Sequence, residues 1–488
     1  EMNSRFFSAL LFLVTPLTQT VMAQPERPRR PNVLFMIADD LNTSLSGFGH
    51  KQCLTPNLDR LCDRGVRFEN MHCQYPVCGA SRASIMSGLY PYTNLTLGNA
   101  GTLRGSMPDV TTLSQCFGKQ GYFTARVSKI YHMRIPFEII DGTSESDDPL
   151  SWDHAVNVKA PEQNAPGVVT QWSPKDKGSQ TFAGIMANGG DSDHADGMAA
   201  DQAIELLNQV GDRPFFLAVG FVRPHVPLVA PTKYFELYRR DEMIAPVVPE
   251  DDLKDVPKII RNYKRNQTTY GVTPELHQGL LQAYYASISY MDAQVGRVLE
   301  ALQENGLAEN TVVVFTSDHG YLLGHHHKFQ KQHLFEEATR VPFIISVPWL
   351  AEQHGSATRQ MTELVDLYPT LTDLAGLTAP NGLQGQSLKP LILDANTTDW
   401  TKDCAFTISR SGGESLRTER FRFTQWGFGE SGFELYDLKK DPAEFTNHAK
   451  NPDYESILQQ MRSRLEKERR RAGFDRNREA IFKKVKRK

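Results

Sequence analysis

The run NVLFMIA at residues 32–38, followed directly by Asp39 and Asp40, decides the fold prediction. It has the length of a strand, and its apolar residues follow one another without polar alternation, which is typical of a central strand buried on both faces. Three more runs of this kind occur, PFFLAVGF at 214–221, TVVVFT at 311–316 and VPFIISV at 341–347. The sequence therefore predicts a sheet that is covered on both sides.

Helical patterns separate these runs. Their boundaries carry start and stop signals, such as Thr-Pro before the first turn and Gly after the last. We expect helices over residues 55–65, 112–120, 199–210, 273–306 and 365–375, and further strands at 66–71 and 122–127. This alternation predicts an α/β protein with a mostly parallel central sheet flanked by helices. Such sheets place their chemistry at the carboxyl ends of the strands.

The pattern changes near residue 400. Short aromatic stretches precede a final helical stretch at 454–471, and the expected strands lie at 404–409, 416–426 and 433–438. We therefore predict a main domain over residues 24–400 and a smaller C-terminal α+β subdomain over residues 401–488.

The first 23 residues have the layout of a secretory signal peptide. Arg5 precedes the apolar run Phe6–Val14, and small residues stand before position 24. The alternative, an anchor helix, needs about 20 apolar residues, and this run is shorter. We expect cleavage after Ala23, export to an oxidising compartment and no membrane span.

Charge and cysteine content exclude some classes of protein. The 488 residues carry 54 Lys and Arg against 57 Asp and Glu, a formal net charge of −3. This balance argues against a nucleic-acid-binding protein, which usually has a strong basic excess. Six cysteines in a chain of this length are too few for a disulfide scaffold.

Carboxylates follow two of the expected buried strands. Asp39 and Asp40 come after residues 32–38, and Asp318 with His319 comes after residues 311–316. Buried carboxylates need charge compensation, which a divalent cation supplies. An oxygen-rich set favours Ca²⁺ or Mg²⁺. The alternative for each pair is an ordinary solvated turn.

Cys78-Gly79-Ala80-Ser81-Arg82 opens another expected helix. A helix N-terminus with free N–H groups is a ready anion site, and Arg82, one turn further on, could clamp an oxyanion there. The alternative interpretation of Cys78 is a buried free cysteine.

Basic residues form a third set of candidates. Together they indicate a pocket for a tetrahedral anion, although each histidine alone could be structural; they are Lys129, His132, Arg223, His225, His325, His326, His327, Lys328 and Lys331. The His triplet could also be a transition-metal site, but consecutive residues seldom all face one ion. Helix capping and dipole pairing would explain another cluster, Asp191, Asp193, His194 and Asp196.

These residues resemble the formylglycine-dependent sulfatases. Residues 78–82 match that family's Cys-x-(Pro/Ala)-x-Arg signature within a longer similar run, and the resemblance covers nearly all of the expected mature chain in order. Further matching stretches are residues 30–34 with 39–41, 55–59, 316–320 and 435–442.

Within the family the chain most resembles the iduronate-2-sulfatase-like members, through residues 127–132, 215–227, 285–292 and 415–418. Residues 324–328 depart from that subgroup, and residues 133–196 match it poorly.

The resemblance implies a fold, a cofactor set and roles for residues. It implies an alkaline-phosphatase-like sheet and oxidation of Cys78 to formylglycine by a separate maturation enzyme. It implies one Ca²⁺, preferred over Mg²⁺, with the ligands Asp39, Asp40, Cys78, Asp318 and His319. Arg82 would hold formylglycine, Lys129 and Lys331 would bind sulfate, His225 would protonate the leaving alcohol, and His132 would act as base or orienter.

The implied function is removal of sulfate from sulfated sugars by an exported enzyme, either periplasmic or secreted, or lysosomal or extracellular in a eukaryote. Two alternatives stay open: a sulfatase for algal sulfated polysaccharides, and a phosphonate monoester or phosphodiester hydrolase of the same superfamily.

Overall fold

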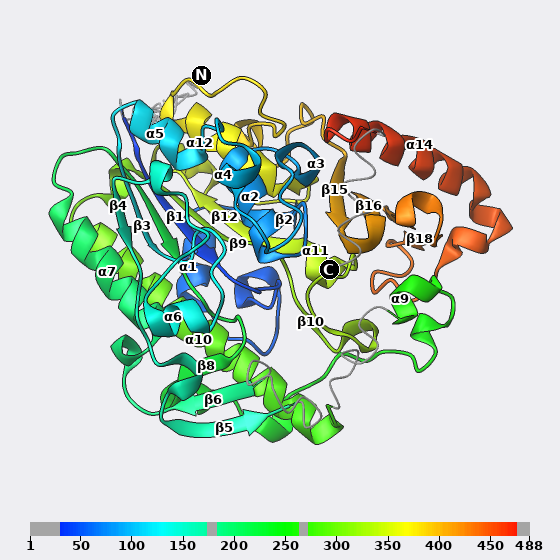
Figure 1. Ribbon diagram of the computed structural model, residues 1–488, viewed down its shortest axis with the longest axis horizontal. Coiled ribbons are helices and arrows are strands. Elements are labelled where there is room, and N and C mark those ends of the chain that lie inside the picture. The colour runs from blue at the N-terminus through cyan, green and yellow to red at the C-terminus, as the bar shows by residue number, and fades with distance from the viewer. Residues whose placement is uncertain (1–29, 173–182, 263–271, 476–488) are drawn as a thin grey trace, which may run out of the picture.

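The computed structural model describes residues 30–172, 183–262 and 272–475 (Figure 1). The expected signal peptide lies outside the described residues. A nine-stranded sheet with the order β13-β2-β12-β9-β1-β7-β3-β4 forms the centre, and β14 pairs with β2. Within it, β1 (Asn32–Ala38) lies between β7 (Phe215–Gly220) and β9 (Thr311–Ser317) and runs parallel to both.

The outer strands extend this core. β3 (Phe123–Ser128) runs parallel to β7, and β4 (His154–Val156) parallel to β3. β12 (Arg340–Ser346) is the antiparallel exception, inserted between β9 and β2 (Val66–His72). The short β13 (Ala357–Thr358) and β14 (Thr362–Glu363) run parallel to β2. The predicted mostly parallel α/β sheet is confirmed.

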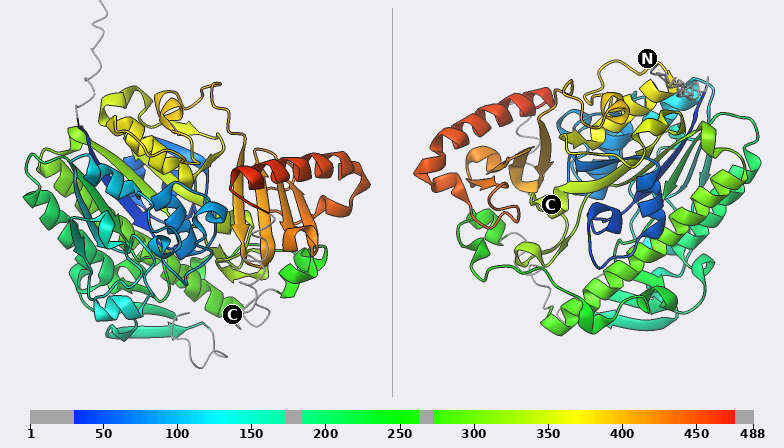
Figure 2. Two further views of the ribbon diagram at one scale, coloured as in Figure 1. Left: turned by 45° about the horizontal axis from the view of Figure 1, so that its top comes forward. Right: turned by 180° about the vertical axis from the view of Figure 1, so that it is seen from behind.

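Alternate side chains of β1 enter two different hydrophobic cores. Leu34 and Met36 pack with α1 (Pro56–Asp63), α7 (Ala195–Gln209) and α10 (Pro274–Glu304). Val33 and Phe35 pack on the other side with α2 (Cys78–Ser87), α5 (Leu113–Lys119) and α12 (Leu367–Ala375) (Figures 1 and 2). Each fully buried large apolar side chain stabilises the fold by about 1.5–3 kcal/mol. Burial on both faces explains the unbroken apolar run.

The C-terminal part is a separate antiparallel sheet. β15 (Cys404–Ser409), β16 (Gly413–Thr418), β17 (Phe421–Trp426) and β18 (Gly432–Asp437) pair in sequence order, and α14 (Glu455–Arg471) packs across them (Figure 2). The predicted α+β subdomain is confirmed. The stretch 416–426 is two strands rather than one, because the chain turns at Glu419 and Arg420.

Several short elements carry no clear sequence signal. A third sheet consists of β5 (Gly167–Gln171), β6 (Ala183–Ala187) and β8 (Leu228–Pro231), and β10 (Leu322–Leu323) pairs with β11 (Phe329–Gln330). The remaining short helices are α3 (Pro91–Asn94), α4 (Leu103–Ser106), α6 (Phe137–Asp141), α8 (Thr232–Phe235), α9 (Lys258–Asn262), α11 (Glu336–Thr339) and α13 (Lys389–Leu393). Their patterns are too short for periodicity to mark them.

The start of α1 differs from the expectation that the Thr55 side chain caps it. Thr55 instead bonds to Ser46 and Asp59, and the free N–H groups of Asn57 and Leu58 donate to the Asp292 carboxylate at 3.1 and 2.8 Å. Asp292 lies on α10, so the cap comes from a distant helix that local sequence does not reveal.

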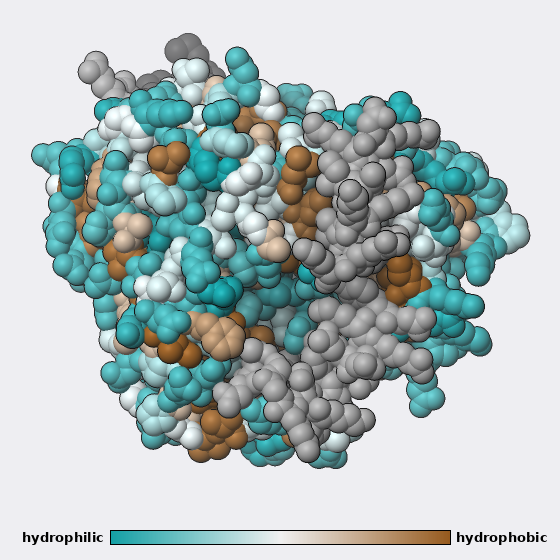
Figure 3. All heavy atoms as spheres, in the orientation of Figure 1, coloured by the Kyte–Doolittle hydropathy of each residue, from teal (hydrophilic) through white to brown (hydrophobic). Residues whose placement is uncertain are grey.

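The surface and the cysteines add two facts. Among the described helices, none is long and apolar enough to cross a bilayer. The face in Figure 3 is mostly hydrophilic outside the grey atoms, with scattered apolar side chains. All six cysteines lie in the described residues as buried free thiols.

Candidate active site

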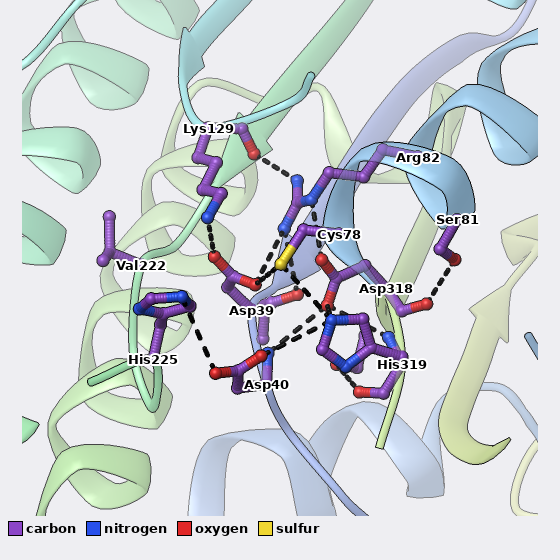
Figure 4. A network of polar contacts seen from close by, with 12 residues as sticks. Asp39, Asp40, Cys78, Ser81, Arg82, Lys129, Val222, His225, Asp318 and His319 are labelled. Carbon is purple, nitrogen blue, oxygen red and sulfur yellow. Dashed lines mark hydrogen bonds and ion pairs between the residues drawn. The ribbon is translucent and has the colours of Figure 1, made fainter. Parts of the chain in front are cut away.

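The carboxyl ends of four adjacent strands converge on one point (Figure 4). Asp39 and Asp40 follow β1, Asp318 and His319 follow β9, Lys129 follows β3, and His225 lies in the loop after β7. Since neighbouring parallel strands end at the same edge, residues far apart in the sequence meet there. Every one of these residues was predicted from the sequence.

Cys78 is the first residue of α2 and lies at the centre of the cluster. Its Sγ is 3.3 Å from Asp39 Oδ1, 3.3 Å from His319 Nε2 and 3.0 Å from Lys331 Nζ. Gly79 must be glycine, because a Cβ there would lie 2.4 Å from the Gly98 carbonyl oxygen. The start of the helix is therefore pressed against the neighbouring loop.

Arg82 directs its donors at protein oxygens. Its Nε donates to Asp318 Oδ2 at 2.8 Å, its Nη1 to the carbonyls of Lys129 and Ile130 at 2.6 and 3.1 Å, and its Nη2 lies 3.8 Å from Asp39 Oδ1. This buried guanidinium ties the ends of β1, β3 and β9 together and offsets the charge of two carboxylates.

The other cationic groups surround the same acids. Lys129 forms a buried ion pair with Asp39, and Lys331 Nζ donates to Asp40 Oδ1 at 2.6 Å. His225 Nε2 lies 3.8 Å from Asp40 Oδ2. His132 is close enough to Lys129 for charge to act between them, and its Nδ1 has no hydrogen-bond partner in the part of the chain that is described.

Burial and charge act in opposite directions on the acids. Burial opposes ionisation of Asp39, but the charges of Lys129 and Arg82 hold its pKa well below the usual range. Burial raises the pKa of Asp40 to about 7, despite the charge of Lys331. Burial also opposes protonation of His319, yet Asp318 and Cys78 raise its pKa to about 9. The pKa values of two neighbouring aspartates are thus moved in opposite directions.

The pKa values of the two histidines proposed as acid and base, His225 and His132, are both lowered. Burial and the charge of Lys331 lower the pKa of His225 well below its usual range. Burial and the charge of Lys129 lower the pKa of His132 to about 3. Both imidazoles are therefore neutral near pH 7 while no anion occupies the site.

Left-handed backbone conformations border the site. Asp40 has φ 63°, Ser128 before Lys129 has φ 57°, and Gln330 and Gln332 on either side of Lys331 have φ 70° and 76°. Non-glycine residues rarely adopt this region, and strain of this kind concentrates at functional sites.

The donor set fits a divalent cation. Ligand atoms of Asp39, Cys78, Asp318 and His319 lie within 4.8 Å of one another, and so do those of Asp39, Asp40, Cys78 and His225. Asp40 Oδ2 is buried and accepts no hydrogen bond from the described residues. His319 Nδ1 faces the Gly320 carbonyl at 2.9 Å, which leaves Nε2 directed at the carboxylates. Carboxylate oxygens of this kind suit a hard cation.

Further residues support the site without a sequence signal for their role. The Tyr284 hydroxyl donates to the Asp40 carbonyl at 2.8 Å and accepts from Asn42 N–H at 3.1 Å. Ser317 Oγ accepts from Leu41 N–H at 3.1 Å, and Ser81 donates to the Asp318 carbonyl. On a buried helix or strand, such residues cannot be told from ordinary core residues by pattern alone.

The prediction that helix capping explains the acidic cluster at the start of α7 is wrong for Asp191 and Asp196. The Asp196 side chain does not cap that helix; its carboxylate accepts from Val222 and Arg223 N–H at 2.7 and 3.0 Å. Asp191 bonds to Lys233, Tyr234 and Gln294. Tertiary contacts, rather than helix capping, therefore account for both carboxylates.

The His triplet does not converge on one point. His325 Nδ1 accepts from Leu323 N–H at 3.3 Å, His326 Nδ1 pairs with Asp252 at 3.0 Å, and His327 Nε2 faces the Pro249 carbonyl at 2.8 Å. Three different partners mean that the rings cannot share one ion. Within the described residues 325–331, Lys331 is the one that contacts the site, through Asp40 and Cys78.

Comparison with known proteins connects this geometry to a family. The family model described as Sulfatase matches residues 31–377, and the one described as N-sulphoglucosamine sulphohydrolase, C-terminal, matches residues 324–471.

Individual relatives agree with the family models. A sulfatase of Formosa agariphila is 31% identical over 489 residues, covering 96% of this chain and 92% of the relative. The iduronate 2-sulfatase of Mus musculus is 30% identical over 526 residues, covering 88% and 93%. The phosphonate monoester hydrolase of Silicibacter pomeroyi superposes with a TM-score of 0.76 and 23% identity over 92% and 97%, a likeness of fold alone. The chain thus belongs to the sulfatase family and is a sulfuric ester hydrolase.

Proposed function

We propose that the chain removes sulfate from sulfated sugars. The observation that supports this most is the surroundings of Cys78 at the start of α2, where an acid, an imidazole and an ammonium group lie within 3.3 Å of its Sγ. A nucleophile at this position would lie beside cationic groups, which also attract a bound sulfate. The mouse relative is named as an iduronate sulfatase, which supports a sugar ester as substrate.

Cys78 is the residue to be modified. A separate maturation enzyme would oxidise it to formylglycine, whose hydrated aldehyde supplies the attacking hydroxyl group. Lys331 contacts the Sγ of Cys78 directly, and Arg82 is held near it by contacts with Asp39 and Asp318. Their charges offset the negative charge of a nucleophile formed there.

Lys129 and Lys331 bind the sulfate oxygens. His225 donates a proton to the leaving sugar hydroxyl, and His132 orients the nucleophile or accepts its proton. The low pKa of His225 in the free enzyme is compatible with this role. Lys331 and Lys129 lower it, and an anionic sulfate bound between them would offset their charges and favour the protonated imidazole.

Ca²⁺ is the proposed metal, held by Asp39, Asp40, residue 78, Asp318 and His319. When bound, it polarises the sulfate oxygens and lowers the pKa of the attacking hydroxyl. The protonated His319 and Lys331 neutralise the same carboxylates when no cation is present.

We also propose export. The signal-like residues 1–23 support a periplasmic or secreted enzyme, or a lysosomal or extracellular one in a eukaryote. N-terminal sequencing of the protein from its native host tests this, because export predicts a mature chain that starts at Gln24.

The decisive test joins a mass spectrum to a substrate panel. The peptide with Cys78, taken from active enzyme, should show the mass of formylglycine; an intact thiol in fully active protein would exclude the proposed nucleophile. The same preparation should hydrolyse sulfated monosaccharides and uronic acid sulfates. Faster hydrolysis of a phosphonate monoester would favour the alternative activity, and selectivity for algal oligosaccharides would favour the other alternative.

A further inference from the structure

The loop that carries His225 is held by buried charged groups that take no part in the chemistry proposed above. It connects β7 to β8, and Val222 and His225 from it are seen beside the site in Figure 4. Its first residue, Phe221, donates its N–H to the Ile37 carbonyl of β1 at 2.8 Å. Beyond that bond the loop leaves the sheet, so other groups must fix its course.

Asp196 fixes the first half of the loop. It lies in the first turn of α7, is fully buried, and accepts the N–H of Val222 on Oδ1 at 2.7 Å and that of Arg223 on Oδ2 at 3.0 Å. A carboxylate that spans two consecutive N–H groups fixes the direction of that peptide segment. His225 N–H in turn donates to the Val222 carbonyl at 2.8 Å.

Arg223 and Glu162 fix the second half. The Nη1 of Arg223 donates to the His225 carbonyl at 2.7 Å and to the Pro227 carbonyl, on either side of the turn. Its Nη2 contacts both Glu162 oxygens, and both side chains are about 1% exposed. Buried ion pairs of this kind gain little net stability over an apolar replacement, so a role in positioning accounts better for one here.

These contacts leave one ring nitrogen of His225 directed into the site. Its Nδ1 lies 2.6 Å from the Val226 carbonyl, to which it donates, and Nε2 then points toward Asp40 Oδ2 at 3.8 Å. We propose that Asp196 and the Glu162–Arg223 pair are positioning residues that hold His225 against the leaving group. This rests on the proposed function, in which His225 protonates the departing sugar.

The residues that support the His225 loop lie outside the active-site motifs of the sequence. Glu162 and Asp196 both come from residues 133–196, which match the resembled subgroup poorly. The placement of the acid would then depend on a segment that the active-site motifs do not include.

The test uses two sulfate esters that differ in their need for an acid. A nitrophenyl ester has a good leaving group, whereas a sulfated monosaccharide has a poor one. His225→Ala should lower kcat/KM on the sugar by about 10²–10⁴-fold and on the nitrophenyl ester far less. Asp196→Asn and Glu162→Gln should show the same preference with smaller losses, about 10-fold or more on the sugar, because a shift of about 1 Å can cost up to 10².

Two comparisons separate positioning from general damage. Asp201→Asn is the matched control, because Asp201 lies on the same helix, is partly exposed and pairs with Arg297, and it should leave the ratio of the two rates unchanged. In a His225→Ala background, Asp196→Asn should cause no further loss on the sugar. If Asp196→Asn does not fold, Arg223→Lys keeps the charge but loses the fork and should give the same preference.

The outcomes are distinct. Equal losses on both esters, or additive losses in the double variant, overturn the positioning role while sulfatase activity stands. A His225→Ala variant without leaving-group preference overturns it as well, since there is then no acid to position. A wild-type enzyme that hydrolyses neither ester contradicts the proposed function itself.

Discussion

Two buried clusters of charge in this molecule contain similar side chains and differ in how completely they are paired. One surrounds Cys78 at the strand ends. The other, the Arg422 cluster (Glu336, Arg417, Arg422 and Glu444), lies between α11 and the C-terminal sheet. In the Arg422 cluster, Arg422 joins both glutamates, Arg417 donates to Glu336 at 3.0 and 3.3 Å, and Glu336 N–H donates to Glu444 at 2.8 Å.

The difference in pairing appears in the hydrogen bonds of the acids rather than in the direction of their pKa shifts, because each cluster contains one acid whose pKa is lowered and one whose pKa is raised. Burial opposes ionisation of Glu336, but Arg417 and Arg422 hold its pKa well below the usual range. Burial raises the pKa of Asp40 to about 7. One Asp40 oxygen accepts no hydrogen bond from the described residues. A closed set of pairs stabilises an interface, whereas unmet oxygens beside a thiol indicate a site that binds something. Charge density alone does not distinguish the two.

The largest expected effect is the loss of the nucleophile. Cys78→Ala should lower kcat by at least about 10⁴-fold, because the position of the attacking group is removed. Release of sulfate from a sugar ester measures this. Cys116→Ala is the matched control, because Cys116 is a buried free thiol on α5 and should lower stability without lowering kcat of the folded enzyme. Retained activity in Cys78→Ala would mean that the nucleophile lies elsewhere.

The second-largest expected effect concerns the metal, which should bind at the cluster around Cys78 and not at the Arg422 cluster. Chelation should abolish activity, and Ca²⁺ should restore it and raise the thermal midpoint, since a ligand at 100 times its Kd stabilises by about 2.7 kcal/mol. Asp40→Asn should lose most of the Ca²⁺-dependent shift, which is measured by thermal unfolding with and without Ca²⁺.

A change in the Arg422 cluster provides the control for the metal experiment. Arg422→Met should keep the full Ca²⁺-dependent shift in thermal midpoint. A shift that survives Asp40→Asn unchanged, or that disappears in Arg422→Met, would contradict the assignment of the metal to the site.

The third effect belongs to the Arg422 cluster itself. Arg422→Met should lower the free energy of unfolding by about 3–5 kcal/mol, because it removes the main cationic partner of the buried Glu444 and one of the arginine partners of Glu336. Denaturant titration measures this. Arg239→Gln is the control, because Arg239 and Asp241 are both exposed and their pair should contribute little to stability. Activity per folded Arg422→Met molecule should change little; a large loss would mean that the cluster also positions Lys331, five residues before Glu336.

The sequence predicted the site better than the supports around it. Asp39, Asp318 and Lys129 follow strands whose apolar runs or turns are visible locally, so their convergence follows from the order of a parallel sheet. Asp196 and Asp292 look like helix-capping or surface acids, yet each accepts N–H groups from a segment far away in the chain. Contacts of this kind depend on packing between elements, which periodicity does not encode.

The same limit applies to the fold. The buried strands and long helices were predicted within a few residues, whereas β5, β6 and β8 were missed because strands of four or five residues are too short to show a period. The split of residues 416–426 into β16 and β17 depends on a turn without Gly or Pro, formed by Glu419 and Arg420. Pairing between strands, not composition, creates that boundary.

The smallest effect concerns an acid next to the Arg422 cluster that forms no ion pair with the described residues. Glu434 accepts hydrogen bonds from Tyr436 at 2.8 Å and from Trp426, and burial raises its pKa to about 7 from the ordinary 4.5. The native state therefore holds the proton more tightly than the unfolded chain. Its contribution to stability is full below pH 4.5 and is lost as the pH rises through 7.

Glu434→Gln keeps the neutral form at all pH values, so its stability should fall less than that of the wild type between pH 4.5 and 8, by up to about 3 kcal/mol. Unfolding measured across this range in both proteins gives the difference directly, and the contribution of Asp40 cancels because both proteins contain it. Glu419→Gln, at an exposed turn of the same sheet, should run parallel to the wild type. Parallel curves for Glu434→Gln as well would show that Glu434 is ionised and paired in the native state, as Glu336 is, and would remove this acid from the contrast between paired and unpaired carboxylates.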